Sequence, residues 1–110
     1  MPRITPPLPP RLQRTLDGLG QKLQLARLRR LYTAELVAER AGISRATLSR
    51  AEHGDPAVAL GTYARILLAL NLDGDLEGIA RDDELGRKLQ DLALTTPKRV
   101  RSRTPKVQEP

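Results

Sequence analysis

The stretch from Thr33 to Gly54, TAELVAERAGISRATLSRAEHG, constrains the fold of this chain more than any other part of the sequence. Its first residue is a good N-cap for a helix over residues 34–41, and Gly42 suits the end of that helix because glycine readily adopts the left-handed conformation. Ser44 is then placed to cap a second helix over residues 45–52. The pattern therefore predicts two short helices joined by a turn of about three or four residues, which is helix-turn-helix geometry.

Apolar residues spaced three and four apart predict further helices on both sides of this stretch. A first helix is expected to begin near Leu19 with Asp17 as its N-cap, because Gly18 and Gly20 interrupt the apolar stripe, and to end near Leu31. No segment shows the strict alternation of a strand, so the predicted fold class is all-α. The remaining helices are expected over about residues 60–70, 75–81 and 82–93.

The two ends of the chain differ in composition from its middle. The first ten residues contain five prolines, and the last sixteen mix Pro, Ser, Thr and basic residues with few apolar ones. We therefore expect four parts, which are a proline-rich arm (1–14), a helix-turn-helix domain (15–72), a C-terminal helical extension (73–94) and a basic flexible tail (95–110).

The composition argues against several classes of protein. The chain has no cysteine and one histidine, and it shows no glycine-rich phosphate loop and no cluster of acid, base or metal-ligating residues. We therefore expect neither an enzyme nor a cofactor or metal site. No apolar run reaches the roughly 20 residues of a membrane span, and the N-terminus does not resemble a secretion signal. The expected location is cytoplasmic, on the nucleoid, with no membrane partner.

Charge is distributed unevenly along the chain. Residues 21–50 carry seven basic and two acidic side chains, whereas residues 51–94 carry four basic and nine acidic ones. Such a polarised chain can present one face to a polyanion. The chain contains only two aromatic residues, both tyrosines, which disfavours recognition of single-stranded bases by stacking.

The stretch from about Leu19 to Leu72 resembles the Cro/C1-type (Xre family) helix-turn-helix domain, and its most specific part is the segment AERAGISRATLSRAEHG. The resemblance implies a lambda repressor-like, five-helix domain, here with an extra C-terminal helix, that binds double-stranded DNA. It also implies that the helix over residues 45–52 enters the major groove. Carried over by position, it assigns base reading to Arg45, Ala46 and Arg50, adjacent support to Thr47 and Ser49, and phosphate contact to Thr33 and Ser44.

Two further positions follow from the same resemblance. The family usually has a glutamine where this chain has Ala34, which changes the expected phosphate contacts and leaves the docking of the reading helix unchanged. Arg27 and Glu52 occupy positions where the family often has a buried ion pair, so we expect them to hold the fold. His53 is expected to be an exposed loop residue.

A second resemblance concerns the C-terminal part. The run DDELGRKLQDLALTTPKRVRSR, after ALGTYARILLALNL, is similar to HipB-like antitoxins of Hip-type toxin–antitoxin systems. This implies a homodimer on a palindromic operator that represses its own operon and restrains a HipA-like Ser/Thr kinase toxin. The alternatives are a stand-alone Xre-family repressor without a toxin partner, and an interaction module that does not bind DNA.

Overall fold

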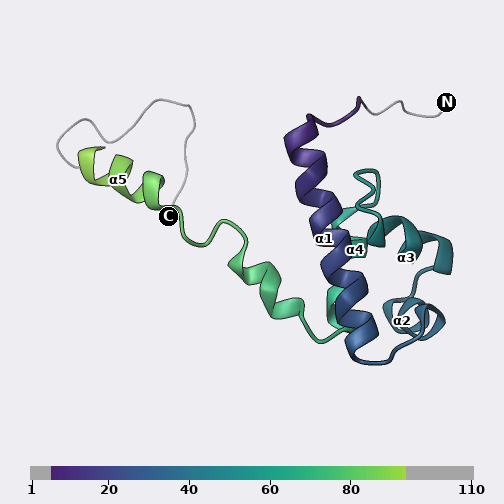
Figure 1. The fold of residues 1–110 in the computed structure, drawn as a ribbon. Coiled ribbons are helices and arrows are strands. Elements are labelled where there is room, and N and C mark those ends of the chain that lie inside the picture. The colour runs from purple at the N-terminus through teal and green to yellow at the C-terminus, as the bar shows by residue number, and fades with distance from the viewer. Residues whose placement is uncertain (1–5, 94–110) are drawn as a thin grey trace, which may run out of the picture. The chain divides into compact units, whose positions relative to one another are not determined.

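The computed structural model describes residues 6–93, which form helices joined by short loops and contain no strand (Figure 1). The contacts divide the chain into two compact units, which meet between Glu77 and Gly78. The all-α prediction is confirmed for these residues. The elements are α1 (Pro10–Arg29), α2 (Ala34–Ala41), α3 (Arg45–Glu52), α4 (Leu60–Ala69), the 3-10 helix η1 (Asp73–Gly78) and α5 (Glu84–Ala93).

The expected five-helix domain needs a correction. The first unit holds four α-helices, and the segment expected as a short helix over residues 75–81 is instead the 3-10 helix η1. Gly74 and Gly78 give the reason, because two glycines within six residues disfavour an α-helix and leave a tighter, shorter turn. With α5, six helices are present in the described part of the chain.

The first helix begins nine residues earlier than expected, at Pro10. Proline suits the first helical position because its ring fixes a helical φ and its missing N–H would have had no helical partner. Residues 10–14 are therefore helical and not part of an extended arm, and Asp17 lies inside the helix and is not its N-cap. There Oδ1 of Asp17 accepts a hydrogen bond of 2.9 Å from the Gln13 side chain.

Two glycines allow α1 to cross the C-terminal end of α3 at very short distance. A Cβ atom added to Gly20 would lie 2.5 Å from the carbonyl oxygen of Glu52. Gly54 follows α3 with a φ of +73°, and a Cβ there would lie 2.6 Å from the carbonyl oxygen of Leu16. The side chain of Gln13 adds a hydrogen bond of 3.1 Å to the carbonyl of Gly54. Gly20 is therefore a packing residue, and it does not interrupt α1.

The predicted bounds of α2 and α3 are confirmed. Thr33 accepts a hydrogen bond of 3.0 Å from the backbone N–H of Leu36, so it caps α2 as expected. Gly42 ends α2 in the left-handed conformation, at φ 71° and ψ 34°. This conformation turns the chain sharply, so that α3 begins only three residues later.

The core of the first unit is aliphatic except for Tyr63. Val37 and Leu48 are almost fully buried, and the partly buried Ile43 packs against this core from the turn. Small side chains such as Ala38 allow the helices to approach closely. The buried cluster consists of Leu23, Ala26, Val37, Ala38, Ala41, Leu48, Ala51, Val58, Tyr63, Ile66, Leu67 and Leu70.

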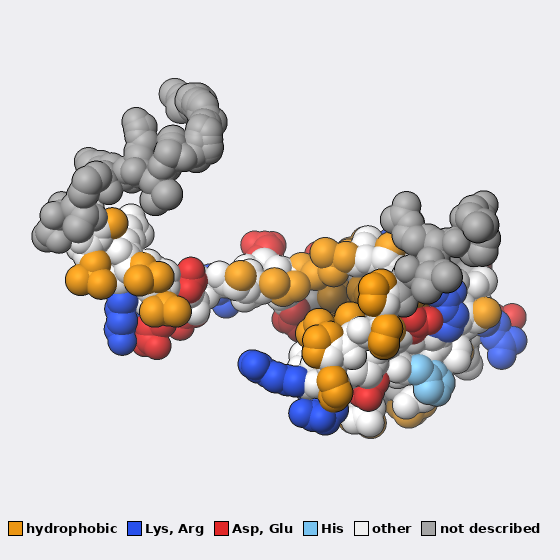
Figure 2. All heavy atoms as spheres, turned by 90° about the horizontal axis from the view of Figure 1, so that it is seen from above, with side chains coloured by type: hydrophobic (Ala, Val, Ile, Leu, Met, Phe, Trp, Pro, Cys, Tyr) orange, Lys and Arg blue, Asp and Glu red, His pale blue; other side chains and the backbone are white. Residues whose placement is uncertain are grey.

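Helix α5 belongs to the second unit and begins two residues later than expected. Its Leu85 and Leu89 side chains are exposed, and hydrophobic side chains are visible on the surface of each unit (Figure 2). Among the described residues, no helix combines the length and the hydropathy that crossing a membrane requires. The basic tail expected over residues 95–110 lies outside the described residues.

Candidate nucleic-acid interface

Helix α3 has one face in the core and one face in solvent. Leu48, Ala51 and Glu52 are buried, and their spacing of three and four residues marks the inner face. All but one of the predicted contact residues on this helix are exposed; Thr47 is half-buried. The exposed ones are Arg45, Ala46, Ser49 and Arg50. The structure thus brings the predicted base readers together on one outward helical face.

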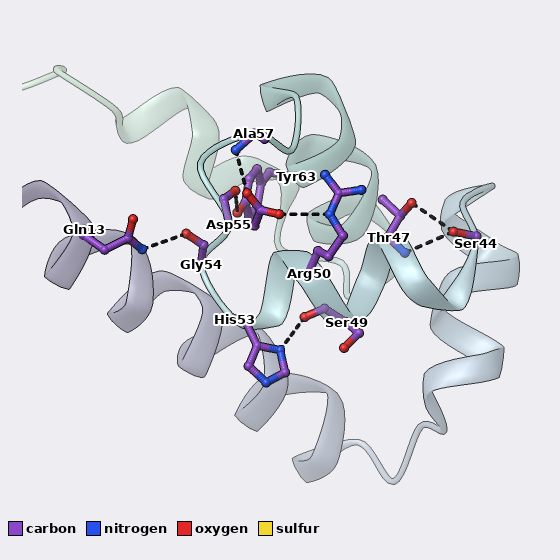
Figure 3. Close-up of polar contacts among 10 residues, drawn as sticks. All are labelled: Gln13, Ser44, Thr47, Ser49, Arg50, His53, Gly54, Asp55, Ala57 and Tyr63. Atoms are coloured by element: carbon purple, nitrogen blue, oxygen red, sulfur yellow. Dashed lines mark hydrogen bonds and ion pairs between the residues drawn. The ribbon is translucent and has the colours of Figure 1, made fainter. Parts of the chain in front are cut away.

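Ser44 and Thr47 form a cap at the start of α3 (Figure 3). Oγ of Ser44 accepts a hydrogen bond of 3.0 Å from the Thr47 backbone N–H and donates one of 2.9 Å to the Thr47 hydroxyl. The predicted N-cap is therefore confirmed. Because the two hydroxyl groups bond to each other, they fix the start of the helix, and phosphate contact by Ser44 stays a prediction.

The C-terminal half of α3 carries an ion pair that sequence reasoning missed. Nε of Arg50 donates to Oδ2 of Asp55 at 2.9 Å (Figure 3). Oδ1 of Asp55 accepts from the backbone N–H of Ala57 at 2.8 Å. The hydrogen bond from Arg50, together with that from Ala57, holds the pKa of the Asp55 carboxyl below its ordinary value. Asp55 is therefore ionised beside a predicted base reader at neutral pH.

An open depression of about 480 Å³ lies beside α3. Arg45, Ala46 and Ser49 line it from α3, and Gln24 lines it from α1. Arg50 is not among its lining residues. Of the two predicted arginine readers, Arg45 therefore borders this depression and Arg50 does not.

His53 is exposed in the turn after α3, as expected, and it also lines this depression. It is the C-cap of α3, and its Nδ1 lies 2.7 Å from the carbonyl oxygen of Ser49. Because a carbonyl only accepts, Nδ1 is the donor in this contact. The spacing of Arg45, Ser49 and His53, four residues apart on one helix, is the signal that could have found this residue.

The expected ion pair between Arg27 and Glu52 is confirmed. The two side chains join α1 to α3 through two hydrogen bonds, Nε to Oε2 at 2.8 Å and Nη2 to Oε1 at 3.1 Å. They are 12 % and 5 % exposed, and the hydrogen bond to Glu52 raises the pKa of Arg27. Nη1 of Arg27 also donates to the carbonyl of Tyr32 at 3.2 Å, so the pair fixes the loop before α2.

The start of α2 lies next to this loop. Thr33 is exposed and caps the helix, and Ala34 borders the depression beside α3. The guanidinium of Arg40 lies 5.0 Å from the ring centre of Tyr32, a cation–π contact that orients a basic side chain on this helix. Phosphate contact by Thr33 stays a prediction.

Residues 18–77, more than half of the chain, match the sequence model of a family described as a helix-turn-helix domain. The chain belongs to the helix-turn-helix domain family. No curated protein shows significant similarity to it. Membership of the helix-turn-helix family supports a DNA-binding regulator and gives no support for an enzymatic activity. The match begins inside α1 and ends inside η1, at residue 77, so it spans the whole core described above.

Proposed function

We propose that this helix-turn-helix protein is a sequence-specific repressor of transcription that binds double-stranded DNA as a homodimer. The single observation that carries the proposal is the outward face of α3, where two arginines stand on a helix whose other face is locked in the core. In this proposal α3 enters the major groove of each half of a palindromic operator. The two half-sites are about 34 Å apart or a multiple of that distance.

The residues of the exposed face of α3 make different kinds of contact with DNA in this proposal. Arg45 and Arg50 offer guanidinium donors to guanine O6 and N7, a contact that is worth roughly 1–3 kcal/mol of discrimination for each good bidentate pair. Ala46 contacts a thymine methyl, and Thr47 and Ser49 support the arginines. Thr33 and Ser44 contact phosphates at the starts of α2 and α3, which positions the protein without reading sequence.

The charge of the segment that carries α2 and α3 supports the same proposal. Residues 21–50 hold seven basic and two acidic side chains, so this part of the first unit attracts a polyanion. Binding through phosphates releases counterions, and the non-specific part of the affinity therefore falls steeply as salt rises.

The proposal extends to an antitoxin of a HipBA-like toxin–antitoxin system that represses its own operon and neutralises a HipA-like kinase. It is supported by the similarity of the C-terminal run that begins at Asp82, part of which forms the amphipathic helix α5. The second candidate is a stand-alone repressor of the same family. It is favoured by the family match, which ends at residue 77 and does not include α5.

A gel-shift experiment tests the proposal. The probe is duplex DNA from upstream of the protein's own gene, with a shuffled duplex of the same composition as control. We expect specific retardation that Arg45→Ala weakens for the upstream duplex more than for the shuffled one. Arg87→Ala, which removes an arginine from α5, is the matched control and should preserve the preference. Equal retardation of both duplexes by the wild-type protein would refute sequence-specific binding.

Addition of the product of the neighbouring gene to the same gel separates the two candidates. A further shift of the retarded band by a kinase-like neighbour supports the antitoxin. An unchanged band supports the stand-alone repressor.

A further inference from the structure

Arg50 is held by one edge of its guanidinium. Its Nε donates to Oδ2 of Asp55 at 2.9 Å, and neither of its Nη groups makes a hydrogen bond with the described residues (Figure 3). A bidentate contact with a guanine uses two N–H donors from one arginine. With Nε occupied, the two Nη groups form the edge that is still open for such a contact.

Asp55 is held in place by hydrogen bonds of its backbone and of its carboxylate. Its backbone N–H donates to the carbonyl of Arg50 at 3.0 Å, and its Oδ1 accepts from the N–H of Ala57 at 2.8 Å. Its carbonyl accepts from the hydroxyl of Tyr63 at 2.9 Å, and Tyr63 is buried in the core on α4. The carboxylate therefore has a defined position relative to both α3 and α4.

We propose that Asp55 is a positioning residue that holds Arg50 in the geometry needed to read a base. This inference rests on the proposed function, because it assigns Arg50 to base recognition. A free arginine on a helix surface loses much rotamer freedom when it binds, and an arginine already held by a carboxylate loses less. The pre-organised guanidinium therefore gives a larger difference in binding free energy between the right and the wrong base.

The charge of Asp55 adds an effect of opposite sign. A carboxylate close to the DNA-facing surface repels phosphates, so it lowers the affinity for all sequences alike. Asp55 thus lowers general affinity and raises discrimination. A residue that only stabilised the loop after α3 would not produce this pair of effects.

Asp55→Asn is the variant that separates these roles. The asparagine keeps the carbonyl oxygen that accepts from Ala57, so the turn is preserved, but it removes the charge that holds Nε of Arg50. Asp82→Asn is the matched control, because Asp82 also pairs with an arginine, Arg87, on the surface of the second unit. The probe is a duplex selected by the wild-type protein from a randomised library, together with all its single-base-pair variants.

We expect Asp55→Asn to lower discrimination at one base pair of each half-site by about 10-fold, within the range of a bidentate contact. Affinity for a shuffled duplex should be unchanged or higher, and the thermal midpoint should stay close to that of the wild type. Arg50→Ala should lower discrimination at the same base pair. In the Arg50→Ala background, Asp55→Asn should have no further effect, because it acts through Arg50. Asp82→Asn should match the wild type.

Three results would overturn the inference, and they are distinguishable. If Arg50→Ala lowers discrimination and Asp55→Asn does not, Asp55 has no positioning role and the proposed function stands. If Asp55→Asn weakens binding to all sequences equally and lowers the thermal midpoint, its role is structural. If the wild-type protein selects no preferred sequence from the library, the proposed function itself is wrong.

Discussion

Two glycines in α1 should respond in opposite directions to the same substitution. A Cβ at Gly20 would lie 2.5 Å from the oxygen and 2.7 Å from the carbon of the Glu52 carbonyl, and 2.8 Å from the oxygen of Ala51, all backbone atoms. To reach ordinary van der Waals contact, α1 and α3 would have to separate by about 1 Å. Gly18 lies two residues earlier in the same helix and has no atom within 4 Å of its added Cβ.

The magnitudes follow from these contacts. Gly18→Ala should stabilise the protein by about 0.5–1 kcal/mol, because alanine favours a helix over the unfolded chain. Gly20→Ala gains the same term but adds overpacking of roughly 1–3 kcal/mol. The separation would also strain the hydrogen bonds between Arg27 and Glu52, which cross between the same two helices. The free energies of unfolding of the two variants should therefore differ by roughly 2 kcal/mol.

Thermal and urea unfolding followed by circular dichroism at the helix band would measure this difference. A gap of roughly 2 kcal/mol corresponds to about 10 °C in a domain of this size. Gly18→Ala serves as the internal control for helix propensity. If Gly20→Ala were as stable as Gly18→Ala, the close crossing of α1 and α3 described here would be incorrect.

Three further predictions concern the scaffold. Glu52→Gln should lower the free energy of unfolding in urea by about 3 kcal/mol, because it leaves the partly buried charge of Arg27 without its counter-charge, and the double variant Arg27→Met/Glu52→Leu should recover most of that loss. Burial, followed by the nearby charge of Asp55, raises the pKa of the Tyr63 hydroxyl. The contribution of Tyr63 to the free energy of unfolding is therefore fully present below the unfolded pKa of about 10, and it is lost as pH rises through the folded pKa. The wild-type thermal midpoint should accordingly fall further than that of Tyr63→Phe between about pH 8 and pH 11, and equal falls would contradict this reasoning. Gly42→Ala should cost about 1–2 kcal/mol in the same unfolding measurements, and Gly42→Asn less, because asparagine tolerates the left-handed conformation.

Local signals explain why α2 and α3 could be predicted to the residue. Thr33, Gly42 and Ser44 act within one turn of their own position, so their effect does not depend on the rest of the fold. The prediction of an α-helix over about residues 75–81 was wrong for a related reason. Whether so short a segment with two glycines becomes an α-helix or a 3-10 helix depends on a small difference in free energy.

The start of α1 could not be predicted because Gly20 has two opposite interpretations. By itself, a glycine next to Gly18 and Asp17 indicates the end of a helix. In the folded protein it permits a contact with Glu52, which lies far along the sequence. Only the crossing of two helices decides between these interpretations, and no local pattern contains that information.

The candidate site shows the same limit. The outward positions of α3 and the pair between Arg27 and Glu52 were correctly expected, the pair from its place in a known family pattern. The contact between Arg50 and Asp55 was missed because it crosses the turn after Gly54, whose φ of +73° sets where Asp55 lies. Gln24 was missed because it approaches α3 from another helix.

The crossing of α1 and α3 has a consequence for how such a protein can evolve. The inward side of α3 is held by the contacts of Gly20 and Gly54 and by Glu52, whereas Arg45 and Ala46 contribute nothing to the core. Substitutions at the outward positions should therefore change the free energy of unfolding very little, so under the proposed function a lineage can change the DNA sequence that it binds without first losing stability. Arg50 differs from the other outward residues, because it pairs with Asp55, whose carbonyl accepts a hydrogen bond from Tyr63 on α4.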